Sequence, residues 1–219
     1  LIVRDLTLPS ILSVTSTTAN GDYKSGSNVN LTLTFAESVV LSAGTLSITL
    51  NSGAQVSVSS LTSSNTISTT YTVGGSDQTN DLSISSITVT AGTLSDIAGN
   101  TLSQSGTVSI TAGANLADNK AIKIDNLAPT LTTVTATPTG TYKAGDVIKV
   151  ILGFDDVVTL SGSGTISVTL NSGASITANS LTSSNTLSID YVVQSGNNTN
   201  GSKLDLTGVT LTGTLTNAA

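Results

Sequence analysis

Oxygen-bearing side chains gather at three places along the chain where they could bind a hard metal ion. Calcium takes roughly six to eight oxygen ligands from carboxylates, amides, backbone carbonyls and water. The candidate calcium ligands are Asp96, Asn100, Asp118, Asn119, Asp125 and Asn126. Their spacing is neither that of an EF-hand nor that of a glycine-rich calcium-binding repeat. The alternative interpretation is that Asp and Asn only form turns here, because their side chains hydrogen-bond to the neighbouring backbone.

The side chains that most enzymes use for acid–base or nucleophilic catalysis are scarce. The chain has no His and no Cys, so it lacks an imidazole base and a thiol nucleophile. Asp155 and Asp156 are adjacent on an expected strand, where neighbouring side chains point to opposite faces. Asp156 and Glu37 each lie two residues after a phenylalanine, which indicates repeated architecture. We therefore expect no enzymatic activity and no catalytic residues.

Composition excludes two classes of partner. A net charge of −6 and an isoelectric point near 4.2 disfavour nucleic-acid binding, which usually needs a basic patch. No apolar run approaches the roughly 18 residues of a membrane-spanning helix.

Hydrophobic residues make up 37% of the chain and charged residues 9%. This composition favours a folded chain, because disordered segments usually combine low hydrophobicity with high charge.

Apolar and polar residues alternate over most of the chain, which is the period of a strand with one buried face. In the segment 29–35, for example, Val29, Leu31, Leu33 and Phe35 share one face. The same alternation predicts strands at 45–50, 66–73, 82–89, 148–154, 166–170, 187–193 and 204–211. No helical period is sustained, and Gly, Asn, Asp and Ser separate the segments. This rhythm predicts an all-β chain of antiparallel β-sandwich type.

The chain repeats itself at a distance of 119 to 122 residues. Residues 21–35 return as 140–154, and residues 52–73 return as 172–193. The aromatic residues all pair across the repeat: Tyr23 with Tyr142, Phe35 with Phe154, and Tyr71 with Tyr191. This pairing favours a scaffold role over a sugar-binding platform. We predict two domains, at 9–126 and at 127–219, of a size typical of sandwiches.

The first and last residues of the sequence do not coincide with the boundaries of the repeated unit. Residues 1–9 align with 121–129, so residues 1–8 are expected to form a terminal strand that belongs to, or is donated to, a neighbouring sandwich. Residues 127–219 contain no equivalent of 107–111 or 121–125, so the second domain is expected to lack its last strands. The interface residues under this hypothesis are Leu1, Ile2, Val3, Arg4 and Asp5.

Two interpretations of this frame stay open. In donor-strand complementation, residues 1–5 of one copy add a strand to the 127–219 sandwich of the next, giving a head-to-tail filament. Alternatively, the sequence is cut from a longer covalent array of repeats. Arg4 stands where the internal copy has Ile124, which counts against a tightly buried donor strand.

Several loose motifs occur in a fairly specific order: Ala-Pro, Gly-x-Tyr-Lys-x-Gly, a strand that ends in Phe, Asp96-Ile-Ala-Gly-Asn100, and 119–125. This series resembles the bacterial immunoglobulin-like tandem repeats of large secreted adhesins and surface-layer-like fibre proteins. The resemblance covers essentially the whole chain and departs at Asn217-Ala-Ala219. It implies two tandem Ig-like antiparallel sandwiches at the cell surface or outside the cell, with calcium locking the junction between domains.

The resemblance implies a structural role, as a rod-like spacer or filament subunit. The expected partners are further copies of the chain or adjacent repeats of the same chain. The alternative is an adhesin module that binds a glycan or a protein of a host or surface. Its binding elements would be the loops 74–81 and 194–202, which differ in length and sequence between the copies.

Overall fold

The computed structural model describes residues 4–104 and 106–217. It confirms an all-β chain, with 57% of residues in strands and 2% in helices, and its sheets are consistent with β-sandwiches. The chain divides between Asn126 and Leu127 into two compact units, here called the first and the second unit. Within the described ranges, no helix has the length and apolar character that a membrane crossing requires.

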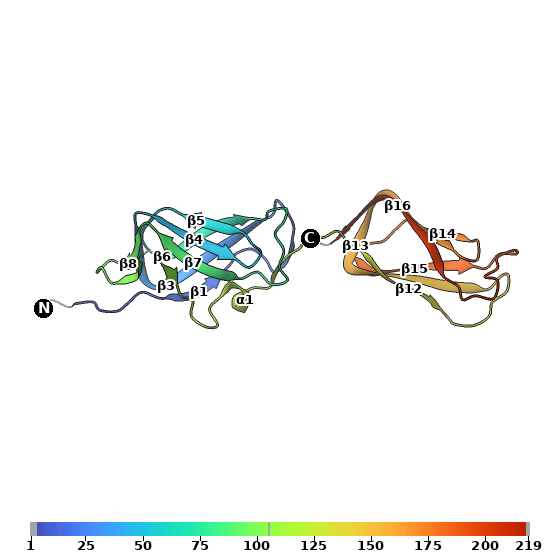
Figure 1. The fold of residues 1–219 in the computed structure, drawn as a ribbon, viewed down its shortest axis with the longest axis horizontal. Coiled ribbons are helices and arrows are strands. Elements are labelled where there is room, and N and C mark those ends of the chain that lie inside the picture. Colours follow the sequence, from blue (N-terminus) through green and yellow to red (C-terminus); the bar gives the residue numbers. More distant parts are fainter. Residues whose placement is uncertain (1–3, 105, 218–219) are drawn as a thin grey trace. The chain divides into compact units, whose positions relative to one another are not determined.

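The first unit has two main sheets and one short helix (Figure 1). One sheet has the order β1-β3-β8-β9, with β6 also paired to β3; the other has the order β10-β7-β4-β5. The elements are β1 Ile11–Thr15, β2 Gly21–Tyr23, β3 Asn28–Ser42, β4 Thr45–Leu50, β5 Gln55–Val58, β6 Leu61–Thr72, β7 Ile84–Thr90, β8 Thr93–Asp96, β9 Thr101–Gln104, β10 Thr107–Val108, α1 Leu116–Asn119 and β11 Ile122–Ile124.

The core of the first unit follows from the alternation in its strands. On β3, Val29, Leu31, Leu33 and Phe35 are buried, while the polar residues between them are only partly buried. The inward residues of β4 and β7 belong to the same hydrophobic cluster. Both sheets therefore contribute to one interior, as the period of two predicts.

A closing segment, residues 106–125, completes the first unit. It contains β10, α1 and β11, and its buried side chains include Val108, Leu116, Ile122 and Ile124. β10 pairs with β7, a bridge joins Ile110 to Ile11 of β1, and β11 lies parallel to β2. The closing segment thus covers the interior between β1 of one sheet and β7 of the other.

The second unit follows the strands of the first as far as the equivalent of β8, except that residues 140–142, the equivalent of β2, form no strand (Figure 1). Its elements are β12 Leu131–Thr137, β13 Val147–Leu170, β14 Ser175–Ala178, β15 Ser184–Val192 and β16 Leu206–Asn217. The long strand β13 pairs with β12 and β15 through its first half and with β14 and β16 through its second. Within the described residues, this unit has no counterpart of the closing segment.

Two glycines let the long strands of the second unit pass one another closely. Gly213 of β16 has a φ of +82°, and a Cβ placed on it would lie 2.7 Å from the Cα of Gly164 on β13. A side chain at Gly213 would therefore be strained in φ and would collide with backbone. In the first unit, a Cβ placed on Gly44 would lie 2.2 Å from the backbone oxygen of Thr90, and one placed on Gly92 would lie 2.2 Å from that of Ala43.

Candidate functional site

A groove in the second unit exposes residues whose counterparts in the first unit form the core. Val134 faces Leu152 in the register in which Val14 faces Leu33. Val14 is completely buried, whereas Val134 is 39% exposed. Three further pairs show the same difference. Ile11, Ile87 and Val89 of the first unit are buried. Their counterparts in the second unit, Leu131, Val209 and Leu211 respectively, are 38%, 40% and 43% exposed.

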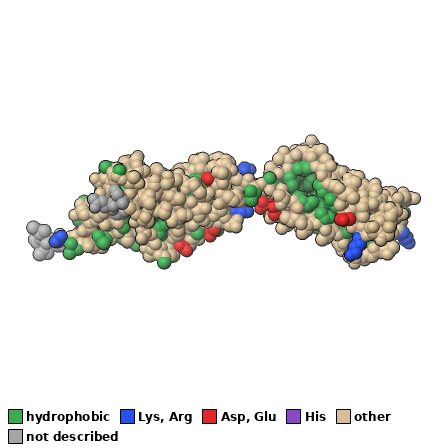
Figure 2. Space-filling view, viewed as in Figure 1, with side chains coloured by type: hydrophobic (Ala, Val, Ile, Leu, Met, Phe, Trp, Pro, Cys, Tyr) green, Lys and Arg blue, Asp and Glu red, His purple; other side chains and the backbone are tan. Residues whose placement is uncertain are grey.

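The exposed residues belong to the inner faces of the sheets. Directly opposed residues of an antiparallel pair share one face. Val209 and Leu211 oppose Val168 and Ile166, both of which are buried. Figure 2 shows hydrophobic side chains gathered in a hollowed part of the visible face of the second unit. The groove thus lies between β12 and β16, where the first unit has its closing segment.

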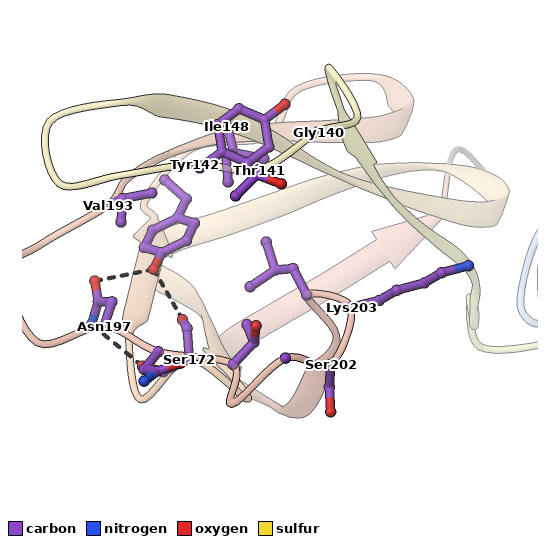
Figure 3. Close-up of a pocket in the computed structure, with 14 residues that line it drawn as sticks. Gly140, Thr141, Tyr142, Ile148, Ser172, Val193, Asn197, Ser202 and Lys203 are labelled. Atoms are coloured by element: carbon purple, nitrogen blue, oxygen red, sulfur yellow. Dashed lines mark hydrogen bonds between the residues drawn. The ribbon is translucent and has the colours of Figure 1, made fainter.

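One end of the groove is a hollow of about 470 Å³ (Figure 3). It is lined on one side by Gly140, Thr141 and Tyr142, and on the other by the loop 197–204. A second hollow of about 440 Å³ shares Gly140, Tyr142 and Leu204 and continues towards Ala136 of β12. Gly140–Tyr142 is the repeat equivalent of β2, so this hollow occupies the position of β11.

The floor of the hollow is held by a buried tyrosine. The phenol of Tyr191 donates to Oδ1 of Asn197 at 3.0 Å, and its oxygen lies 3.0 Å from Oγ of Ser172; dashed lines reach Asn197 and Ser172 in Figure 3. Asn197 Oδ1 also accepts from the backbone N–H of Gln194 at 2.8 Å, which fixes the start of the loop. The loop that walls the hollow is therefore anchored to the core.

An acidic cluster, defined as Asp5, Glu37 and Asp96, lies at another place in the first unit. Their carboxylate oxygens lie within 4.8 Å of one another. Asp5 precedes β1, Glu37 is on β3, and Asp96 ends β8. Asn100 donates from its backbone and its side chain to Asp96, each at 2.7 Å, and its side chain also donates to the backbone carbonyl of Asp5 at 3.3 Å.

The electrostatics of the acidic cluster set Glu37 apart. Burial, followed by the charges of Asp5 and Asp96, raises the pKa of Glu37. Burial also acts to raise the pKa of Asp96, but the hydrogen bonds from the side chain and backbone of Asn100, together with those from the backbone of Gly99 and Ala98, outweigh it and lower that pKa. Oε1 of Glu37 is buried and finds no hydrogen-bond donor among the described residues. A shared proton or a cation would satisfy this oxygen.

The donor set fits the expected calcium in part. Three carboxylates close together are the ligands that calcium prefers, and backbone carbonyls and water would have to supply the rest. Of the predicted ligands, Asp96 belongs to this cluster, and Asn100 lies beside it with its amide nitrogen used in hydrogen bonds to Asp96 and Asp5. Asp5 and Glu37 are not among the predicted ligands.

The predicted ligands Asp118 and Asn119 cap helix α1. Asp118 accepts from the backbone N–H of Asn115 at 2.9 Å and completes a capping box. The side chain of Asn119 donates to the carbonyls of Val14 and Asn115 at 3.0 and 2.9 Å. These contacts are those of the alternative interpretation, in which Asp and Asn satisfy local backbone groups.

The predicted ligands Asp125 and Asn126 hold β11 in place. Asp125 is buried, pairs with Lys123 at 2.7 Å and accepts from the side chain of Gln78 at 3.2 Å. The side chain of Asn126 donates to two carbonyls of the loop 74–81 and accepts from the N–H of Ser25 at 2.6 Å. The loop 74–81, one of the expected binding loops, therefore serves to hold the closing segment.

Of the expected interface residues, Arg4 and Asp5 are exposed, and Leu1, Ile2 and Val3 lie outside the described residues. Leu6 and Leu8, which follow them, are 66% and 64% exposed. Residues 4–10 form no strand in the first unit.

Comparisons with protein-family models and with curated proteins find no match to the chain.

Proposed function

We propose that the chain is a structural part of a surface or extracellular protein, a rod-like spacer or filament subunit built from Ig-like sandwich repeats. In this proposal, the groove of the second unit is closed by a β-segment from outside residues 127–217. The observation that supports it is the exposure of Leu131, Val134, Val209 and Leu211 at positions that are buried in the first unit.

Physical reasoning favours a β-segment as the occupant. Each large side chain that becomes fully buried stabilises a fold by about 1.5–3 kcal/mol, and the closing segment of the first unit buries Val108, Leu116, Ile122 and Ile124. The edges of β12 and β16 at the groove also offer backbone groups to a new strand. An adjacent repeat of the same chain or a further copy would supply the segment.

Hydrogen exchange on the full chain tests this proposal. A synthetic peptide with the sequence of residues 106–126 is expected to slow amide exchange in β12 and β16 and to raise the unfolding temperature. A control peptide with Leu116, Ile122 and Ile124 changed to Asp is expected to do neither. Equal exchange with both peptides would contradict the proposal.

The alternative function is recognition of a glycan or protein by the second unit. The observation that favours it is the hollow itself, because the expected binding loop 194–202 forms one of its walls. Glycan-array binding that persists when the 106–126 peptide is present would favour this alternative. Binding that the peptide abolishes would mean that both occupy the groove.

A calcium ion is proposed for the acidic cluster of the first unit. Bound there, it would join the segment before β1 to β3 and to the loop after β8 through Asp5, Glu37 and Asp96. The support is the proximity of the three carboxylates and the unpartnered oxygen of Glu37. This role is structural and is consistent with a spacer.

A further inference from the structure

The first unit shows which backbone bonds a strand makes in the hollow. The carbonyls of Ala121 and Ile122 accept from the N–H groups of Gly21 and Leu82, at 3.0 and 2.7 Å. Ile124 exchanges two hydrogen bonds with Thr79, at 2.8 and 3.0 Å. Through these contacts, β11 lies between β2 and the loop 74–82 and runs parallel to β2.

The second unit repeats the groups that would accept this strand. Gly140 and Leu204 correspond to Gly21 and Leu82, and both line the hollow. Thr199 corresponds to Thr79, because Asn198 bonds Ser172 as Gln78 bonds Ser52. The N–H groups of Gly140, Thr199 and Leu204 have no backbone partner in the described part of the chain. These N–H groups can therefore donate to a strand that lies in the hollow parallel to Gly140–Tyr142.

We propose that residues 1–4 of a second copy of this chain occupy the hollow, parallel to Gly140–Tyr142, with Ile2 in the place of Ile122, while Asp5 stays in the acidic cluster of its own unit. The inference rests on the proposed function and names the partner for that end of the groove. It is supported by the alignment of residues 1–9 with 121–129, including Ile2, Asp5 and Pro9. It is also supported by the exposure of Arg4, Leu6 and Leu8 in their own unit.

Arg4 weakens the proposed contact between residues 1–4 of one copy and the hollow of the next, here called the joint. It takes the place of Ile124, which is completely buried in the first unit. A guanidinium at that position must keep its head in water or lose hydration, so the contact is weaker than that of β11. The joint between copies is therefore reversible, and the substitution Arg4→Ile converts it to the pattern of the internal strand.

Hydrogen exchange of the full chain at increasing concentration tests the inference. In the wild type, protection of residues 139–143 and 199–206 is expected to rise with chain concentration. Arg4→Ile is expected to lower the concentration of half-protection by about ten-fold or more, and Ile2→Asp is expected to abolish the effect. Leu12→Asp, at a 57% exposed position of β1, is the matched control and should behave as the wild type.

The outcomes separate this inference from the proposed function. Protection that is the same in Arg4→Ile and Ile2→Asp would overturn the inference. If the 106–126 peptide protects the groove but a peptide of residues 1–9 carrying Arg4→Ile does not, the second copy is the wrong partner and closure by a β-segment stands. If neither peptide protects it, both proposals fail.

Discussion

Val14 and Val134 hold the same position in the two repeats, opposite Leu33 and Leu152, yet Val14 is completely buried and Val134 is 39% exposed. The strand β1 pairs with β3, and β12 pairs with β13, in the same register around these valines. The difference comes from the closing segment, whose residue Ala114 accepts a hydrogen bond from the N–H of Val14 at 2.7 Å. Burial at this position therefore depends on a segment distant in sequence.

The two valines should respond differently to a charge. Val14→Asp buries a carboxylate without a partner and is expected to destabilise the first unit by more than about 4 kcal/mol. Val134→Asp leaves the carboxylate partly in water and is expected to change the free energy of unfolding by no more than about 1 kcal/mol. Urea unfolding followed by circular dichroism compares them. Equal losses would mean that the groove is closed in the isolated chain.

The sequence predicted the strands well because alternation is a local property. The segment 29–35 shows this, since its inward residues are all buried on β3. Val209 and Leu211 have the same alternation and are exposed, because burial also needs a neighbour that no local pattern reveals. The predicted calcium ligands include Asp96 and its neighbour Asn100 but not Glu37, because β3 brings Glu37 to Asp96 from far away in the sequence.

The buried tyrosines of the two units give a matched pair of substitutions. The phenol of Tyr71 donates to Asp77 at 2.7 Å and lies 3.2 Å from Oγ of Ser52, and burial raises its pKa. Tyr191 makes the equivalent bonds to Asn197 and Ser172. Tyr71→Phe is expected to cost about 1.5–3 kcal/mol because its acceptor is charged, and Tyr191→Phe about 0.5–1.5 kcal/mol. Thermal unfolding of both variants checks this order, and the reverse order would contradict it.

Gly213 passes close to Gly164, whereas Gly208 on the same strand has open space around it, so these two positions of β16 give a second pair of substitutions. Gly213→Ala places a Cβ against backbone at a positive φ and is expected to destabilise the second unit by about 1–3 kcal/mol. Gly208→Ala, also on β16, meets nothing within 4 Å and is expected to change stability by less than about 0.5 kcal/mol. Urea midpoints of the two variants distinguish them. A tolerated Gly213→Ala would show that β16 does not pass β13 in this way.

The stability of the second unit should fall in acid partly through Asp155. The side chain of Thr130, followed by its backbone N–H, donates to Asp155, at 2.6 and 2.7 Å, and these bonds lower the pKa of Asp155 from 3.8. Because the folded pKa lies below the unfolded one, the stabilisation is complete above the unfolded value and is lost as the pH falls through the folded value. Asp155→Asn should make the acid limb of the stability curve shallower. An unchanged limb would show that the contact does not depend on charge.

Calcium should stabilise the first unit if the acidic cluster binds it. At millimolar calcium, the unfolding temperature is expected to rise by about 2–5 °C, and a chelator should reverse the rise. Glu37→Gln separates a bound ion from a shared proton. Without calcium this variant should be more stable than the wild type, because one of three crowded carboxylates loses its charge.

With calcium, Glu37→Gln should no longer respond, because the amide offers a weaker ligand at the position of the unpartnered oxygen. Asp22→Asn is the matched control, since it removes one exposed carboxylate of the same unit outside the cluster. It should keep the full calcium response. If the wild type shows no shift between calcium and chelator, Glu37 is satisfied by a proton shared with Asp96, and the cluster serves only to hold residue 5 against β3 and β8.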